Sequence, residues 1–437
     1  MAEVYKRGSA QAETLQLTRE RFIVKEEEQT YIAVPFELMG DGYERIEIRY
    51  SYDKQAAGSV VDIGLKSPER IVGWSGGARN SFFVGLEKAT PGYLAGPIAS
   101  GMWAVLLGAY RIPEAGCRVT VEITAVPARG RWLKGDLHMH TVHSDGSYTP
   151  AEVISLCSGR GLDFIALTDH NTASQNRFSL SADERLLIIP GVELTSYKGH
   201  ANLLGQPDAL HDFRVLTPET AASELWQARD KGAFISLNHP FCDNCPWELG
   251  FDVPYDAIEV WNGPWRELNE KAVQWWQEQL GKGERIVALG GSDTHRADRF
   301  VRHGRPAVSI WTMSDTVQGL LDGMRQGRVV LSFDPEETFI TLSSGEYGIG
   351  DSFTPASPEA AVPLRIEASA LKADQVSLWS DQGVEAQWTT DNEQAVFDFE
   401  GASDRLFYRV EARRYMEDID RTIMTCLTNP LYIGRTL

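Results

Sequence analysis

The chain has 437 residues, too many for one compact core, and at ~100–200 residues per domain this length predicts two to four domains. Its 42 Lys and Arg residues against 61 Asp and Glu residues give a formal net charge of −19. This charge argues against a nucleic-acid-coating or anionic-membrane-binding surface, because phosphates attract positive patches. The 43% hydrophobic and 24% charged content is ordinary for a folded globular chain and argues against wholesale disorder.

The start of the chain and its cysteine content indicate the cellular compartment of the protein. The first 15 residues lack the apolar core of a secretory signal, and the most apolar stretch, residues 102–107, is too short to cross a bilayer. Five cysteines in a chain of this length do not form a disulfide framework. We therefore expect a cytoplasmic protein with mostly free thiols and no membrane partner.

The first zone of the chain predicts short β-strands separated by turn residues. Strands are expected at residues 31–38, 44–52, 60–65, 102–110 and 118–126. Regularly spaced short strands without helical periodicity favour a β-sandwich or jelly roll. Residues 1–130 are therefore predicted to form a domain of this kind.

From residue 133 onward, strands alternate with helices. Short apolar runs, typical of buried parallel strands, occupy residues 163–168, 186–189, 234–237, 257–261 and 285–289. Thr149-Pro150-Ala151-Glu152 and Thr217-Pro218-Glu219 each place an N-cap and a proline where a helix begins. Further helices are expected at residues 266–280 and 316–325. The alternation predicts an α/β layer or barrel over residues 131–335.

The last zone is again free of helical signals. Strands are expected at residues 364–368, 375–379, 395–399 and 406–412. Residues 336–437 are therefore predicted to form a C-terminal β-rich domain, either a second all-β module or the missing half of the first.

The segment Asp136-Leu137-His138-Met139-His140 carries a pair of candidate metal ligands. In an extended chain alternate side chains point the same way, so His138 and His140 project to one side. Two adjacent imidazoles suit one divalent metal ion, although an isolated pair is as often two satisfied polar histidines at a strand end.

Recurrence favours the metal interpretation. Ligand-type residues follow the ends of four further predicted strands: Thr168-Asp169-His170-Asn171, Gly191-Val192-Glu193, Asn238-His239-Pro240 and Gly291-Ser292-Asp293-Thr294-His295. His200 adds another imidazole ahead of residues 201–204. The C-terminal edge of such strands is where α/β folds place their active sites.

Over about residues 134–310 the sequence resembles the PHP (polymerase and histidinol phosphatase) superfamily. The matching motifs are, in this order, DLHMHTVHSDG, TDHN, GVE, GH before NLLG, NHP and GSDTH. The segment from Ile258 to Asn262 and the two β-rich ends resemble its carbaryl-hydrolase-type (CehA-like) branch. The resemblance implies a distorted (β/α)7 barrel, flanked by N-terminal and C-terminal β-sandwich-like regions, with two or three metal ions at its C-terminal face.

The resemblance also implies roles for individual residues. The first metal would be held by His138, His140, Glu193 and Asp293, and Glu193 would bridge to a second metal completed by His200 and His239. A third position would be lined by Asp145, His170 and His295. With two metals bound, His170 and His295 would instead hydrogen-bond the substrate.

This ligand mixture suits Zn, Mn or Fe and does not distinguish among them. A divalent pair supplies a metal-bound hydroxide near neutral pH. We expect Asp293 to be both metal ligand and proton acceptor, with His170 and His295 as the other catalytic residues.

Secondary signals concern the substrate. Four arginines follow the last motif, and guanidinium groups bind phosphate; Arg305 is the candidate for substrate contact, with His303 second. Asn262, with Trp261 at a predicted strand end, is a candidate for lining a pocket. Cys242-Asp243-Asn244-Cys245 is a C-x-x-C without the second ligand pair that a structural zinc site needs, and a plain loop is the simpler interpretation.

These features predict a metal-dependent hydrolase, preferably a phosphoesterase acting on a small phosphorylated molecule or nucleotide. Amide, ester or carbamate hydrolysis of the carbaryl-hydrolase type is the alternative within enzymes. A non-catalytic, metal-stabilised binding module is the alternative of another class, but every motif position carries a competent ligand.

Overall fold

The structure is a computed structural model that describes residues 14–39, 42–53, 58–86, 88–128, 130–181, 186–357 and 359–434. Most of the N-terminal stretch in which no secretory signal is expected lies outside the described residues. The chain divides into two compact units, Met1–Gly130 and Arg131–Leu437. In the part of the chain that is described, no helix combines the length and apolar character needed to span a membrane.

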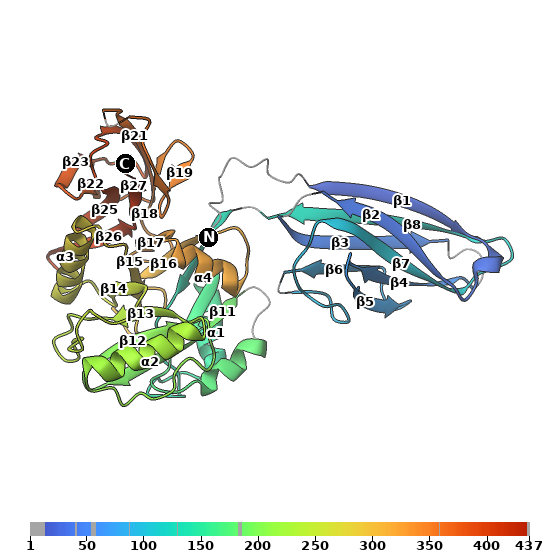
Figure 1. Ribbon diagram of the computed structural model, residues 1–437, viewed down its shortest axis with the longest axis horizontal. Helices are drawn as coiled ribbons and strands as arrows, with labels where there is room; N and C mark the ends of the chain where they lie inside the picture. Colours follow the sequence, from blue (N-terminus) through green and yellow to red (C-terminus); the bar gives the residue numbers. More distant parts are fainter. Residues whose placement is uncertain are drawn as a thin grey trace. The chain divides into compact units, whose positions relative to one another are not determined.

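The described part of the first unit contains two four-stranded antiparallel sheets (Figure 1). One has the order β1-β8-β3-β6 and the other β2-β7-β4-β5. Their bounds are β1 Leu15–Ile23, β2 Tyr31–Leu38, β3 Tyr43–Tyr52, β4 Val60–Lys66, β5 Ile71–Gly76, β6 Ser81–Gly85, β7 Gly101–Arg111 and β8 Cys117–Pro127. Inward side chains of both sheets, such as Ile48 and Val121 in one and Ile63 and Leu107 in the other, share one hydrophobic core.

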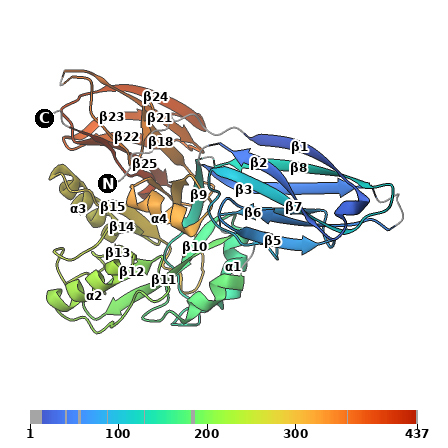
Figure 2. The ribbon, with the colours of Figure 1, turned by 45° about the vertical axis from the view of Figure 1, so that its right-hand side comes forward.

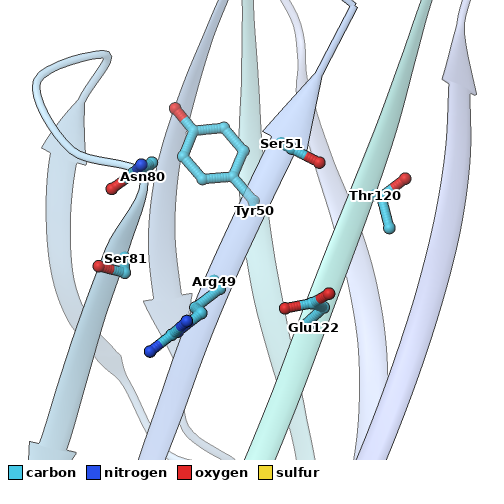
Figure 3. A pocket seen from close by; sticks show the side chains of 7 residues that line it. All are labelled: Arg49, Tyr50, Ser51, Asn80, Ser81, Thr120 and Glu122. Carbon is cyan, nitrogen blue, oxygen red and sulfur yellow. The ribbon is translucent and has the colours of Figure 1, made fainter.

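A polar pocket of about 440 Å³ lies against one sheet of this unit (Figure 3). Arg49 of β3 stands beside Glu122 of β8 and Ser81 of β6, its register partners. None of the seven lining residues is a histidine or a cysteine, so the pocket offers no set of soft metal ligands.

The second unit holds a long mixed sheet whose first seven strands carry the predicted motifs. In sheet order they are β15 Val287–Gly291, β14 Ala257–Asn262, β13 Phe234–Asn238, β12 Gly199–Leu204, β11 Leu187–Ser196, β10 Phe164–Leu167 and β9 Arg131–Asp136. All neighbours in this run are parallel except β12, which pairs antiparallel with β11 and β13. A parallel bridge between Met139 and Thr294 joins the chain just beyond β9 to the chain just beyond β15. The two ends of the seven-stranded run are thus linked.

Among the residues of this unit that the structure describes, four α-helices lie around these strands (Figure 2). They are α1 Pro150–Gly159, α2 Pro218–Asp230, α3 Glu267–Gly281 and α4 Val317–Arg325, together with the 3-10 helix η2 Ser174–Ser181. Thr149 and Glu152 form a capping box at α1, and Thr217 caps α2 with a proline in the first turn, as the sequence predicts. Helices follow β9, β12, β14 and β16, whereas β13 leads to β14 through residues 239–256 without one. The fold is therefore mixed α/β and strand-rich; a complete (β/α)7 alternation stays a prediction.

The chain beyond residue 335 continues the same sheet. After β9 the order runs β16 Ala307–Thr312, β17 Val329–Ser332, β26 Arg421–Thr428, β25 Phe407–Met416, β22 Gln375–Ser380 and β23 Gly383–Thr389. A separate sheet contains β19 Tyr347–Gly348, β18 Phe339–Ser344, β21 Val362–Ser369 and β24 Gln394–Gly401, and the short strands β20 Ser352–Phe353 and β27 Leu431–Ile433 pair with each other. The division into domains 1–130, 131–335 and 336–437 stays a prediction.

Asn429 ties the C-terminal strands to the strand that carries the last motif. Its buried side chain accepts a hydrogen bond from Ala288 N at 2.8 Å and donates to Ala288 O at 2.9 Å and Val329 O at 3.1 Å. These bonds join β15 to β17 and satisfy peptide groups that would otherwise be buried unpaired. The C-terminal segment thus helps to position Asp293 and His295 at the end of β15.

Candidate metal centre

His138 and His140 follow β9 and are fully buried. His138 O accepts from Asp293 N at 2.8 Å, and His140 N donates to Thr294 O at 3.1 Å, so both histidines are held against the segment after β15. Their ring centroids lie 5.2 Å apart. The extended backbone therefore points both imidazoles to the same side of the sheet edge.

Glu193 of β11 lies at the centre of the cluster, with no exposed side-chain surface. Its Oε1 lies 3.2 Å from His138 Nε2, 3.3 Å from His200 Nδ1 and 3.6 Å from His239 Nε2. Its Oε2 lies 3.7 Å from His140 Nε2 and 2.6 Å from His170 Nδ1. One carboxylate therefore faces five imidazoles that come from four segments of the chain.

Asp293 supplies the second carboxylate. Its Oδ1 lies 3.1 Å from His140 Nε2 and 3.4 Å from His138 Nε2, and about a quarter of its side chain is exposed (24%). Asp293 has a φ of +51° and His239 a φ of +27°, backbone conformations that non-glycine residues rarely adopt. Strain of this kind persists where surrounding contacts fix a functional geometry.

A third group lies toward the surface. Asp145 Oδ1 is 3.5 Å from His170 Nε2 and 3.2 Å from His295 Nε2, and the two histidine nitrogens lie 3.4 Å apart. His140, Asp145, His170 and His295 form one set whose ligand-type atoms all lie within 4.8 Å of one another. The residues predicted for the third metal position are thus brought together.

Two buried ring nitrogens test whether the cluster fits metal ions. His138 Nε2 and His200 Nδ1 have no hydrogen-bond partner among the described residues, although each lies within 3.3 Å of Glu193. Buried polar atoms in native proteins are almost always satisfied. A divalent cation would bind the lone pairs of these two histidine nitrogens and the carboxylate that they face. The residues present therefore fit metal ions.

Electrostatics support the same interpretation. Burial works to raise the pKa of Glu193, but the charge of His138 and the close approach of the His138, His170 and His200 imidazoles hold this pKa well below its usual value. Burial works to lower the pKa of His138, and Glu259, Asp293 and Glu193 raise this pKa well above its usual value. Buried carboxylates therefore create a negative potential that attracts positive charge.

Glu259 contacts the cluster and was not singled out by the sequence interpretation. Its Oε1 accepts from His138 Nδ1 at 2.7 Å, and its Oε2 accepts from His239 N at 3.0 Å and Asn262 Nδ2 at 3.1 Å. A carboxylate behind an imidazole fixes its tautomer and raises its basicity as a metal ligand. The signal was available: Glu259 is the one charged residue in the buried strand β14.

Asn238 and Thr195 also support the cluster. Asn238 Nδ2 donates to Glu193 Oε1 at 2.8 Å, and Thr195 Oγ1 lies 2.6 Å from His170 Nδ1. Gly291 permits close packing here, because a Cβ at this position would lie 2.3 Å from the Cβ of His138 and 2.9 Å from Glu259 Oε1.

The three predicted substrate contacts occupy different settings. Asn262 Nδ2 lies 3.3 Å from Asp293 Oδ2, so this residue belongs to the cluster. Arg305 instead pairs with Asp334 at 2.7 Å and lies over the ring of Phe333. His303 is buried beside Tyr148. Their roles toward a substrate stay predictions; Trp261, also considered for a pocket, is fully buried and packs edge-on against Trp265.

Comparisons with known proteins give local matches. No family model matches the chain. An uncharacterised protein of Methanocaldococcus jannaschii is 24% identical over 151 residues, which is 31% of this chain and 85% of the relative. Phosphoribosyl 1,2-cyclic phosphate 1,2-diphosphodiesterase of Eggerthella lenta is 31% identical over 104 residues, which is 21% of this chain and 40% of the relative.

Among solved structures, a two-domain protein of Bacteroides vulgatus, described as containing a predicted PHP-like metal-dependent phosphoesterase, matches 69% of this chain and 96% of its own. The identity is 18% and the TM-score is 0.39. The local match to the Eggerthella phosphodiesterase agrees with the resemblance to the PHP superfamily. Its carbaryl-hydrolase-type branch stays a prediction.

His303 predicts a specific pH dependence of stability. Burial, with a smaller contribution from Arg160, lowers its pKa from 6.5 to about 4. Between these values the unfolded chain binds the proton and the folded chain does not, so stability is full above pH 6.5 and is lost as the pH falls toward 4. Protonation of His303 in the unfolded chain should lower the free energy of unfolding by about 3 kcal/mol over that pH interval.

The measurement is the free energy of denaturant unfolding at several pH values for the wild type and His303→Phe. The variant should lose less stability on acidification than the wild type. The exposed His211→Gln variant serves as a control and should follow the wild type. Parallel curves for His303→Phe and the wild type would contradict the assignment of a buried neutral imidazole.

Glu259 predicts a change in metal affinity. A glutamine at this position has one acceptor oxygen in place of two. It therefore cannot accept hydrogen bonds both from His138 Nδ1 and from His239 N and Asn262 Nδ2. Glu259→Gln should bind its metal ions about 10–100-fold more weakly, as measured by competition with a chelator. The control Glu278→Gln changes an exposed carboxylate of α3 and should bind as the wild type does. Unchanged affinity in Glu259→Gln would show that Glu259 does not orient the ligands.

Proposed function

We propose that this protein, whose residues 134–310 carry the PHP superfamily motifs, is a metal-dependent phosphoesterase that acts on a small phosphorylated molecule or nucleotide. One observation carries the proposal. His138 and His200 each direct a buried ring nitrogen at the same carboxylate, Glu193, and neither nitrogen has a hydrogen-bond partner among the described residues. The phosphodiesterase activity named for the Eggerthella relative supports a phosphate ester as the substrate class.

The proposal assigns each residue of the cluster a place. His138, His140, Glu193 and Asp293 would hold one metal ion, and Glu193, His200 and His239 a second. Asp145, His170 and His295 would hold a third or contact the substrate. When bound, divalent ions such as Zn, Mn or Fe lower the pKa of water and attract the oxygens that gain charge.

The protein's own side chains would position water and substrate. Burial works to raise the pKa of Asp293, but attraction from His138 and a hydrogen bond from His140 hold it well below its usual value, so its carboxylate stays ionised. The ionised carboxylate would accept a hydrogen bond from the nucleophilic water and then its proton. His170 and His295 are partly exposed, and their Nε2 atoms face the same space beside Asp145. They would donate hydrogen bonds to substrate oxygens there.

The proposal includes the distorted (β/α)7 barrel. The bridge between Met139 and Thr294, which links the chain beyond β9 and β15, supports a closed arrangement. A closed sheet brings the C-terminal ends of its strands around one centre, which is the arrangement that a multi-strand ligand set requires.

The test combines metal analysis with a substrate screen. Purified protein is stripped with a chelator, reloaded with Zn, Mn or Fe, and assayed on a phosphomonoester, a phosphodiester, a carboxyl ester and a carbamate that share one chromogenic leaving group. We expect activity on a phosphate ester that is lost on stripping and restored by metal. Asp293→Asn should lower kcat by about 100-fold or more, because a positioned proton acceptor contributes that much.

Asp391→Asn, which changes an exposed carboxylate of the same unit, is the matched control and should retain full activity. Activity that survives complete metal removal would overturn the metal-dependent mechanism. Faster turnover of the carbamate than of either phosphate ester would replace the phosphoesterase with the carbaryl-hydrolase alternative.

A further inference from the structure

The loop that follows β13 brings two thiols beside the imidazole of His239. Cys242 Sγ and Cys245 Sγ lie 3.3 Å apart, and Cys245 Sγ lies 3.7 Å from His239 Nδ1. We propose that Cys242 and Cys245 form a reversible disulfide, and that the reduced Cys245 sulfur holds His239 in the tautomer that a metal ion requires.

The two nitrogens of His239 face different partners. Nε2 lies 3.6 Å from Glu193 Oε1, toward the cluster, and Nδ1 faces Cys245. A histidine that offers Nε2 to a metal must carry its remaining proton on Nδ1, and the group that accepts this proton fixes the tautomer. Carboxylates and backbone carbonyls usually serve as this acceptor; here the sulfur of Cys245 is in that place.

The backbone holds the pair in position. His239 N donates to Glu259 Oε2 at 3.0 Å, and Cys242 N donates to His239 O at 2.9 Å. The loop therefore starts from a fixed point with an unusual φ at His239. The C-x-x-C spacing, with two residues between the thiols, closes a small ring on oxidation and needs only a short approach of the sulfurs.

Access distinguishes this pair from the other thiols. Cys117, Cys157 and Cys426 are buried, whereas Cys242 and Cys245 are half-buried. A small dissolved oxidant can therefore reach the pair and not the other three. Susceptibility of thiols to oxidation follows exposure and a nearby resolving cysteine, and the pair has both.

The chemical step is thiol–disulfide exchange with a small disulfide such as oxidised glutathione. One cysteine sulfur attacks the disulfide, which releases one glutathione thiol and leaves a mixed disulfide. The second cysteine sulfur then attacks the bound cysteine sulfur and releases the other glutathione thiol. The protein loses two electrons and two protons, and the oxidant gains both.

Oxidation removes the acceptor from His239. A disulfide sulfur is drawn toward its partner and carries less negative charge, so the proton on Nδ1 is no longer held. Loss of such a supporting contact weakens metal binding about 10–100-fold. This consequence rests on the metal role proposed for His239, whereas formation of the disulfide does not.

Three variants separate formation of the disulfide from the role of Cys245 toward His239. Cys242→Ala keeps the Cys245 acceptor but cannot form the internal disulfide, so in the reduced state its metal affinity should match the reduced wild type. With oxidised glutathione it should stop at a Cys245–glutathione mixed disulfide, which mass spectrometry detects as an adduct. Cys245→Ala loses the acceptor and should bind metal about 10-fold more weakly even when reduced. Cys245→Ser keeps an acceptor oxygen and should recover most of that loss.

The experiment treats the full-length protein with oxidised or reduced glutathione, alkylates the thiols without denaturation, and determines labelled sites and adducts by mass spectrometry. Zinc affinity is measured on the same samples by chelator competition. For the wild type we expect alkylation of Cys242 and Cys245 after reduction, an unlabelled disulfide without glutathione adduct after oxidation, and a zinc affinity about 10-fold weaker after oxidation than after reduction.

A stable glutathione adduct of the wild type, or continued labelling of both cysteines after oxidation, would overturn the disulfide. A disulfide that leaves zinc affinity unchanged would overturn the role of Cys245 toward His239. Absence of zinc binding in the reduced wild type would instead reject the proposed function, because the labelling pattern reports on the thiols independently.

Discussion

The structure depends on a fully buried carboxylate, Glu193, that faces five imidazoles. An ionised group without water is stable only when opposite charge and hydrogen bonds surround it, and removing the partner of a buried charge costs about 3–5 kcal/mol. Asn238 supplies one fixed hydrogen bond, and the imidazoles supply positive charge or lone pairs. Divalent cations would satisfy the carboxylate and the unpaired imidazole nitrogens together, which explains why the cluster fits metal ions better than a network of hydrogen bonds.

This requirement connects distant parts of the chain. The ligand-type residues come from segments after β9, β10, β13 and β15 and from β11 and β12, and each segment is held by a neighbour. Glu259 orients His138 and the start of the loop at His239, while Asn429 fixes β15 from the C-terminal segment. None of these ligand-type residues lies in a helix, so the site does not require a helix after every strand.

Much of this arrangement was predictable from the sequence because the signals are local. An H-x-H pair and ligand residues at strand ends follow from the alternation of side chains and from the common direction of parallel strands. The capping residues Thr149 and Thr217 likewise predict where their helices begin, without any information on tertiary contacts. The role of Glu259 depends on which side chain faces which imidazole across the sheet, and no local pattern contains that pairing. The continuation of the sheet from β17 to β26 joins residues about a hundred positions apart, and strand pairing over such distances is set by packing.

Anomalous X-ray diffraction from crystals of the protein loaded with Zn or Mn tests the central claim most directly. The account predicts anomalous peaks within about 2.0–2.3 Å of Glu193 and of nitrogens of His138, His140, His200 and His239. Density confined to other sites, or none at this cluster at saturating metal concentration, would contradict it.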